Sequence, residues 1–419
     1  MTSLSGAANG FAALALCRMG GGVGEASASP APYSLLYDYF PKRVRTTVLA
    51  IYSSGIFVGA GLGLIVGGFM LTYWKEAFPD PSTAPLSLKA WQAAFLMVGL
   101  LLAVIVYLLK EPVRGGIDGT RVKAHPHPWR AIFVELATLA PVFGLILVGR
   151  LGGVRAALVN VAIAVATVIG VQCMVLMLGG ETQWYVFGYG VYAFATWAQK
   201  LRLADPDRFE IIFKSRPLIY SSLGFSGCFF LTAGMLAWLA VFFQRVHGAT
   251  AAEVGMVLGL SYAMCGFAGV IVGGMITDGI VSRIGDRGRV LVAAAAVTSA
   301  ALSVLALLVV EDKATAYLLT IPFNFLSAIY VAPGAATVNS LAPAHARATA
   351  SAAYIVCQVF LGTALGPYVV GALSDAIALG GVSSAEALPG GMQLSLLATL
   401  PSLALLIIAY RQEWPKRPE

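Results

Sequence analysis

Long apolar runs recur along the whole chain, and they limit what it can fold into more than any other feature. Residues 154–178 and 291–310 are two of them, and a helix of about 20 such residues spans the hydrocarbon core of a bilayer. Only 11% of the 419 residues are charged, whereas a soluble domain carries about 25%. So few charges cannot cover a water-facing surface, and the sequence therefore predicts an all-α, polytopic membrane protein.

The distribution of basic residues predicts how the chain is oriented. Membrane helices are expected near residues 9–36, 46–73, 89–109, 153–178, 183–199, 217–243, 251–277, 289–310, 315–337, 348–377 and 393–410. With the loop 38–45 taken as cytoplasmic, the opposite side holds only Lys75, Lys89, Arg245 and Lys313 of the 27 Lys and Arg, and Arg18 lies within a span. This positive-inside asymmetry predicts a bacterial inner-membrane protein with a cytoplasmic C-terminus. Because topology explains the positive charge, no nucleic-acid partner is expected.

Residues 130–149 are also apolar, but they contain Glu135 and Pro141 and are flanked by Arg130 and Arg150. If they were a span, every later loop would change sides and the charge asymmetry would be lost. They are interpreted as an amphipathic helix in the membrane interface. The spans at 153–178 and 183–199 then form an additional hairpin in the middle of the chain.

An internal repeat relates the two ends of the sequence. The stretch from Pro41, PKRVRTTVLAIYSSGIFVGAGLG, aligns with the stretch from Pro343, PAHARATASAAYIVCQVFLGTALG. The matched residues are Pro41, Arg45, Thr47, Ala50, Tyr52, Gly59, Leu62, Gly63 and Gly68, with Pro343, Arg347, Thr349, Ala352, Tyr354, Gly362, Leu365, Gly366 and Gly371. Both copies run outward from a cytoplasmic loop, and parallel repeats of this kind are typical of transporters. Chance similarity between Gly- and Ala-rich helices is the alternative.

Small residues mark one stripe of the second predicted helix, where Gly55, Gly59, Gly63 and Gly67 follow each other at four-residue intervals. Glycines at this spacing let two helix backbones approach closely in lipid. The stripe is therefore predicted to pack against a neighbouring helix. The segment GAGLGLIVGG lacks the preceding strand and the following acidic residue of a dinucleotide site.

Charges and small residues alternate in the loop GGMITDGIVSRIGDRGR (273–289), which contains Asp278, Arg283, Arg287 and Arg289. Two interpretations remain open. The loop is either a solvated basic segment or a conformational switch in which these charges tie helix ends together in one state.

Arg18 and Glu25 are the charged residues placed inside the first predicted span. They are seven residues apart, so they share a helix face roughly 10 Å apart along the axis. A charge at the bilayer centre costs about 2.5–3.5 kcal/mol on the insertion scale. One interpretation is a structural pair bridged by water or substrate. The other is that Glu25 exchanges a coupling proton while Arg18 attracts an anionic substrate group.

Two uncharged polar residues complete the candidate site. Asn324 and Gln358 lie in apolar helical surroundings. Each is predicted either to hydrogen-bond substrate or to join neighbouring helices.

These residues together resemble the major facilitator superfamily. RMGGGVGEASASPAPYSLLYDYFPKRVRTTVLAIYSSGIFVGAGLGLIVGG is similar to its fourth and fifth helices, and the Gly-Val-Gly-Glu-Ala element is similar to the Spinster-like branch. The resemblance identifies Arg18 with the arginine of the fourth helix and the loop 273–289 with the loop between the eighth and ninth. It implies that the family's first three helices are missing here. The expected parts are a partial N-terminal bundle (1–110), a cytoplasmic linker with the amphipathic helix and the inserted hairpin (111–216), and a six-helix C-terminal bundle (217–419).

The resemblance implies a secondary active transporter that works by alternating access. Its substrate is expected to be small and amphiphilic or an organic anion, lysolipid-like in the Spinster branch, with a proton as the hypothetical coupling ion. A membrane-embedded lipid-modifying enzyme and a truncated, non-transporting fragment are the alternatives. The histidines lie in predicted loops and the cysteines lie singly in apolar runs. This spacing indicates no metal site, and neither a catalytic residue nor a cofactor is expected.

Overall fold

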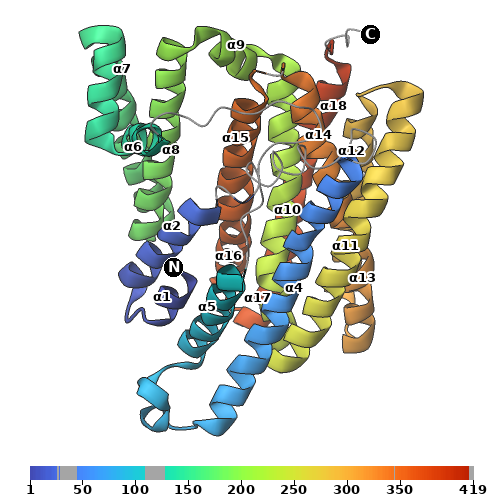
Figure 1. Cartoon of the computed structure of the whole chain (residues 1–419). Helices are drawn as coiled ribbons and strands as arrows, with labels where there is room; N and C mark the ends of the chain where they lie inside the picture. Colours follow the sequence, from blue (N-terminus) through green and yellow to red (C-terminus); the bar gives the residue numbers. More distant parts are fainter. Residues whose placement is uncertain (26–27, 29–44, 109–127, 344, 415–419) are drawn as a thin grey trace.

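The structure is a computed structural model that describes residues 1–25, 28, 45–108, 128–343 and 345–414. Within these residues the secondary structure is entirely helical. Most of the helices run roughly side by side along one direction (Figure 1). The predicted all-α membrane fold is confirmed.

The described residues contain nine helical segments long and apolar enough to cross a membrane. They are α4 (Arg45–Ala77), α5 (Ala90–Leu108), α7 (Pro141–Leu178), α10 (Arg216–Val246), α11 (Ala251–Ile284), α12 (Gly288–Val309), α13 with α14 (Lys313–Ile329, Val331–Leu341), α15 with α16 (Arg347–Gln358, Leu365–Ala378) and α17 with α18 (Ser384–Ser395, Thr399–Arg411). Each coincides with a predicted span.

Two predicted spans are not among the segments that are long and apolar enough to cross a membrane. The first is described only as α2 (Phe11–Glu25), whose apolar part, Phe11–Gly22, is short for a membrane crossing. The second is α8 (Glu181–Ala204), which is long enough but carries polar residues along its last turns, among them Gln199, Lys200 and Arg202. α8 therefore falls short of the apolar criterion by composition, although it runs along the bundle like its neighbours (Figure 1).

The amphipathic segment 130–149 is divided between two helices. α6 (Pro128–Leu139) ends before Pro141, which begins α7. α7 itself is interrupted at Gly153, whose φ of 70° lies in the left-handed region that favours glycine. The chain folds back at this glycine. The evidence is that residues on either side of it lie close together: a Cβ on Gly149 would be 3.5 Å from the Cβ of Ala157. The 153–178 span thus begins after a turn, as the sequence predicts.

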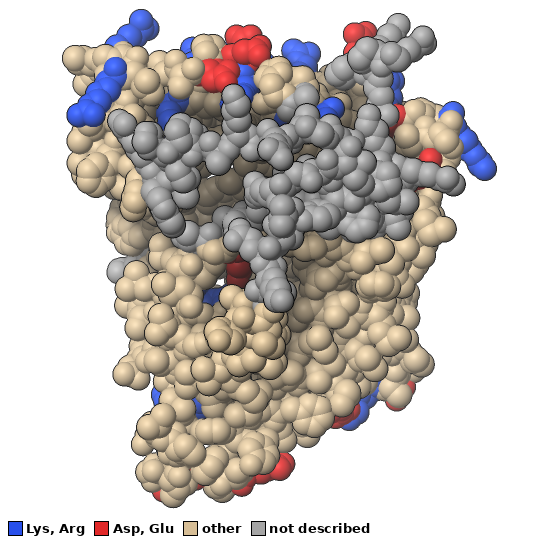
Figure 2. All heavy atoms as spheres, viewed as in Figure 1, with Lys and Arg blue, Asp and Glu red and all other residues tan. Residues whose placement is uncertain are grey.

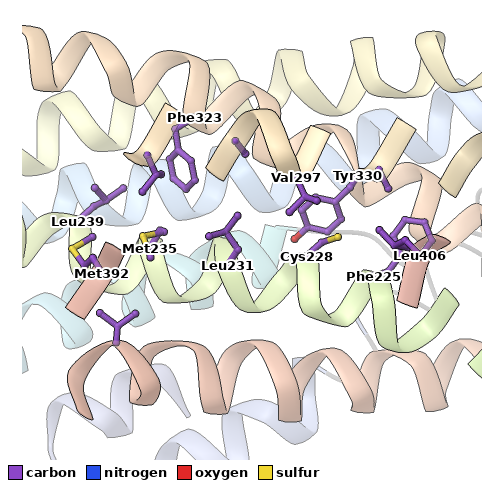
Figure 3. Packing of buried hydrophobic residues seen from close by; sticks show 14 of the residues in the cluster. Phe225, Cys228, Leu231, Met235, Leu239, Val297, Phe323, Tyr330, Met392 and Leu406 are labelled. Atoms are coloured by element: carbon purple, nitrogen blue, oxygen red, sulfur yellow. The ribbon is translucent and has the colours of Figure 1, made fainter. Parts of the chain in front are cut away.

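The best-packed region is the C-terminal half, with α10 at its centre. Figure 3 shows Phe225, Leu231, Met235 and Leu239 on α10, with side chains from the surrounding helices directed at them. Phe225 and Cys228 have no exposed surface, and Met235 is 1% exposed. Lipid tails are as apolar as these side chains, so close van der Waals packing, and not escape from water, holds the helices together.

Glycines also make the close contact between α4 and α11, but they are not the predicted ones. A Cβ on Gly61 would lie 2.3 Å from the carbonyl oxygen of Gly259, and a Cβ on Gly68 would lie 2.5 Å from that of Ala251. The α4–α11 contact therefore lies on Gly61 and Gly68, which are outside the predicted stripe. Among the described residues, no atom lies within 4 Å of a Cβ added at any glycine of the predicted stripe, Gly55, Gly59, Gly63 and Gly67. A packing role for these four against another element stays a prediction.

The second copy of the internal repeat does use its matched glycines for packing. A Cβ on Gly362 would lie 2.3 Å from Phe229, and a Cβ on Gly366 would lie 2.7 Å from the carbonyl oxygen of Phe230, both on α10. Their counterparts in the first copy are Gly59 and Gly63. The same sequence pattern thus makes a backbone contact in one repeat and meets no described residue in the other.

Candidate functional site

Arg18 lies on α2 with its side chain exposed. Its guanidinium carbon is 6.0 Å from the ring centroid of Phe95 on α5, which is at the outer limit of a cation–π contact. No carboxylate forms an ion pair with Arg18 in the described part of the chain. The arginine is therefore a cation without an anionic partner.

Glu25 is the last residue of α2 and is also exposed. No ion pair joins it to Arg18 among the described residues, in agreement with the separation expected on a straight helix. The two charges thus belong to one helix without neutralising each other by direct contact.

A groove of about 470 Å³ opens between α2 and α8. It is lined by Met19, Thr182, Tyr185, Val186 and Tyr189. The lining is mostly apolar and aromatic, and Met19 is the neighbour of Arg18 in the sequence. An apolar groove on the helix that carries Arg18, a cation with no carboxylate partner among the described residues, is compatible with an amphiphile that has an acidic group.

Asn324 joins two helices of the C-terminal half. It is 2% exposed, and its Nδ2 donates a hydrogen bond of 2.9 Å to Ser261 Oγ on α11. Ser261 Oγ is in turn 3.1 Å from Thr320 Oγ1 on α13. The Oδ1 atom of Asn324 is buried with no partner among the described residues. The helix-joining interpretation is therefore realised through Nδ2, and one acceptor remains open to a ligand.

Gln358 is half-buried at the end of α15, and its Nε2 donates to the hydroxyl of Tyr354, 2.9 Å away. The helix immediately after it widens into a π-helical segment, Val359–Ala364, before continuing as α16. Segments of this kind often mark functional sites because they displace the side chains that follow. The ring of Phe360, inside this segment, contacts Phe187 of α8 with 5.3 Å between centroids.

Sequence reasoning missed several polar partners in the same half. The hydroxyl of Tyr330, which is 1% exposed, donates to Thr232 Oγ1 over 3.3 Å. Ser261 and Thr320 were missed as well. Serines, threonines and tyrosines are common in membrane helices, and no local pattern separates those that meet across an interface from those that do not.

In the predicted switch loop, the contacts of charged side chains that the structure describes are made by Asp286 and Arg289, and not by Asp278, Arg283 or Arg287. Asp278 and Arg283 are exposed and Arg287 is half-buried, and the described residues give their side chains no hydrogen bond or ion pair. Arg289, which was named only as part of the loop, pairs with Asp286 at 3.0 Å and donates to Ser340 Oγ on α14 at 3.0 Å. A switch role for Asp278, Arg283 and Arg287 stays a prediction.

A buried polar network holds the inserted hairpin together. Asn160 on α7 has no exposed surface, and its Nδ2 donates to Thr196 Oγ1 and Gln199 Oε1 of α8, each 3.0 Å away. Its Oδ1 accepts from the hydroxyl of Tyr192 over 2.7 Å. Three hydrogen bonds from one side chain tie the two helices into a single unit.

We expect Asn160→Ala to loosen this hairpin. The substitution removes all three hydrogen bonds and leaves buried hydroxyl and amide groups unpaired, which should cost about 1–2 kcal/mol of stability. Thermal unfolding of the purified protein in detergent measures the effect. Asn339→Ala, at an exposed asparagine, is the matched control and should change the midpoint by less than half as much. Equal midpoints for the two variants would contradict a stabilising role for the network.

The structure does not bring all the predicted site residues into one cluster. Arg18 and Glu25 lie on α2, on the opposite side of the molecule in Figure 1 from α13, which carries Asn324. The described residues contain no group of three or more His, Cys, Asp or Glu side chains arranged to hold a metal ion. The fold and the site thus define an integral membrane protein. It consists of many apolar helices that contain few charges and contact one another through glycines.

Comparisons with known proteins assign this chain to a family. The sequence profile of the Major Facilitator Superfamily matches residues 1–367. The chain therefore belongs to the major facilitator superfamily, a family of membrane transporters.

Individual relatives support the assignment. An MFS-type efflux pump of Mycolicibacterium smegmatis is 25% identical over 379 residues, covering 90% of this chain and 66% of the pump. Protein spinster of Drosophila melanogaster is 32% identical over 102 residues, covering 24% of this chain and 14% of that protein. The chain thus spans less than two thirds of the length of these relatives.

The fold is also shared with a solved structure. A bacterial homolog of the human lysosomal transporter Spinster, in its inward-facing and unoccupied conformation, superposes with a TM-score of 0.59 at 19% identity, covering 98% of this chain and 80% of that one. The resemblance to the superfamily and to its Spinster-like branch, predicted from the sequence, is confirmed.

Proposed function

We propose that the chain is a secondary active transporter that moves a small amphiphilic or organic-anion substrate by alternating access. The observation that carries this proposal is Arg18, an exposed cation with no carboxylate partner among the described residues, on α2, the helix that also lines the apolar groove with α8. Family membership and the similarity to an efflux pump support it.

The groove and the cation together favour a substrate with two parts. Its aromatic and aliphatic lining suits an alkyl chain, and an acidic head group would offset the cost of an unpaired charge in the membrane. A lysolipid has this composition, and similarity to the Spinster branch supports the same class. A proton is the coupling ion we propose, with Glu25 as the group that carries it.

Arg18→Ala tests the substrate class. In vesicles containing the purified protein, we expect transport of an anionic lysolipid to lose about tenfold in apparent affinity, because one charge-assisted contact is removed. Transport of a neutral amphiphile of the same chain length should change less than twofold. Arg245→Ala, at an exposed position in the last turn of α10, is the control. A covalently altered lysolipid would indicate a lipid-modifying enzyme instead, and equal losses for both substrates would remove Arg18 from anion recognition.

We also propose an inner-membrane location with the C-terminus in the cytoplasm, on the basis of the positive-inside asymmetry. Reporter fusions after Arg411 should give a cytoplasmic signal, and fusions in the loop between Lys75 and Lys89 should give an external one. A cytoplasmic signal from the Lys75–Lys89 loop would overturn the proposed orientation.

A further inference from the structure

The first part of α7 rises along α8 to the end of the bundle that carries many of the basic residues. Near its start, the carbonyl oxygen of Pro141 accepts a hydrogen bond of 3.4 Å from the hydroxyl of Tyr192. At its end, a Cβ on Gly152 would lie 2.9 Å from a methyl group of Leu203. Tyr192 and Leu203 are about 16 Å apart along the axis of α8 at 1.5 Å per residue. The segment therefore runs alongside the second half of α8 and turns back near the end of that helix.

Both apolar and basic side chains are exposed on this segment. Near the start of α7, Val142 is 66% exposed, Phe143 is 62% exposed and Ile146 is 45% exposed. At the turn, the exposed side chains include Arg150 and Arg155. Exposed apolar side chains thus continue from the start of α7 to the turn, where Leu151 is 47% and Val154 is 77% exposed, and the two arginines stand at the end of this apolar surface.

Neither arginine is neutralised by the protein. In the described part of the chain, no carboxylate forms an ion pair with Arg150 or Arg155. The nearby acid Glu135 is already paired with Lys200 at 2.8 Å. Lys and Arg gather along this upper edge of the molecule, including the upper left, where Figure 1 draws α7 (Figure 2).

The backbone at the turn adds to the positive charge. A new helix begins directly after Gly153 and leaves its first N–H groups without helical partners. The positive end of that helix lies between the two arginines in the sequence, and such ends favour phosphate. This contribution strengthens a site that the two guanidinium groups and the apolar surface below them already define.

We propose that this turn binds an anionic phospholipid of the surrounding bilayer. Arg150 and Arg155 hold the phosphate group, and the acyl chains lie on the outward apolar surface of Val142, Phe143 and Ile146. The site belongs to the inserted α6–α8 region and is separate from the transport groove between α2 and α8.

Native mass spectrometry of the purified full chain, titrated with phosphatidylglycerol or phosphatidylcholine, tests the proposal. We expect the unmodified protein to retain phosphatidylglycerol in preference. Each basic residue near anionic lipid contributes roughly a fivefold preference, so Arg150→Gln with Arg155→Gln should reduce it by about 25-fold. Arg150→Lys with Arg155→Lys should keep most of it.

Arg216→Gln with Arg411→Gln is the matched control, because it removes two exposed cations from the same end of the bundle. This variant should leave the preference within twofold of the unmodified protein. Phe143→Asn should weaken retention of long-chain phosphatidylglycerol while leaving the charges intact. If Arg216→Gln with Arg411→Gln lost as much of the phosphatidylglycerol preference as Arg150→Gln with Arg155→Gln, the proposed site would be wrong. Displacement of the lipid by millimolar inorganic phosphate would show a free-anion site and would also overturn the proposal.

Discussion

Gly61→Leu is expected to have the largest effect on folding of any single substitution considered for this chain. Every atom nearest to an added Cβ at Gly61 belongs to α11, and the closest is the backbone oxygen of Gly259, 2.3 Å away. A backbone atom cannot rotate aside as a side chain can, so α4 and α11 must separate. Overpacking of this kind costs about 3 kcal/mol, and we expect a lower unfolding midpoint and a smaller yield of monodisperse protein in detergent.

Gly63→Leu is the matched control on the same helix. It lies two residues away, about 200° around the helix, and no described atom lies within 4 Å of an added Cβ. From the described contacts, this variant should retain the midpoint of the unmodified protein to within a few degrees, and a clear loss would favour the packing role predicted for the glycine stripe. A second test variant, Gly366→Leu, should lower the unfolding midpoint as Gly61→Leu does, because a Cβ at Gly366 would lie 2.7 Å from a backbone oxygen of α10. If Gly63→Leu were as damaging as Gly61→Leu, the α4–α11 contact would not be the reason for the damage.

Glu25→Gln is expected to abolish proton-driven transport. The proposed coupling role requires a carboxyl group that gains and loses a proton, and an amide of the same shape cannot do so. The exposed position of Glu25 at the end of α2 makes the substitution compatible with folding. In vesicles with an imposed pH gradient, we expect substrate accumulation to fall by about tenfold or more, whereas exchange of labelled for unlabelled substrate at equal pH continues.

The comparison of accumulation with exchange separates coupling from folding and binding. Glu76→Gln, an exposed carboxyl near the end of α4, should change neither measurement. Loss of both activities in Glu25→Gln would assign Glu25 a structural or binding role. Normal accumulation with an unchanged pH dependence would show that Glu25 is not the coupling site.

The placement of the helices could be predicted from the sequence because each bilayer crossing must satisfy its own length and polarity. A run such as 291–310 is apolar enough to form α12 whatever surrounds it, and α12 spans Gly288–Val309 in the structure. The turn before the 153–178 span was also predictable, since Gly152 and Gly153 interrupt a continuous apolar run. The spacing of Arg18 and Glu25 and the family resemblance of the first 70 residues were also readable from the sequence, because each depends on a short stretch of chain.

Contacts between helices were not predictable in this way. The sequence shows two glycine registers on α4, and only the position of α11 decides that Gly61 and Gly68, not Gly59 and Gly63, meet a backbone. The repeat gives no help, because its second copy packs the matched glycines against α10. How far a helix is rotated about its axis depends on every neighbour at once.

The same limit applies to the polar residues. Asn324 was recognised as an unusual residue, but its partner Ser261 lies 63 positions away on another helix. Arg289 rather than Arg287 meets Asp286 and Ser340, because the turn before α12 directs one side chain inward and leaves the other less buried. Thus the sequence by itself determined where most of the membrane helices lie and what family they form, since these depend on local composition and motifs. The tertiary structure alone decided which faces meet, because packing depends on residues that no local pattern connects.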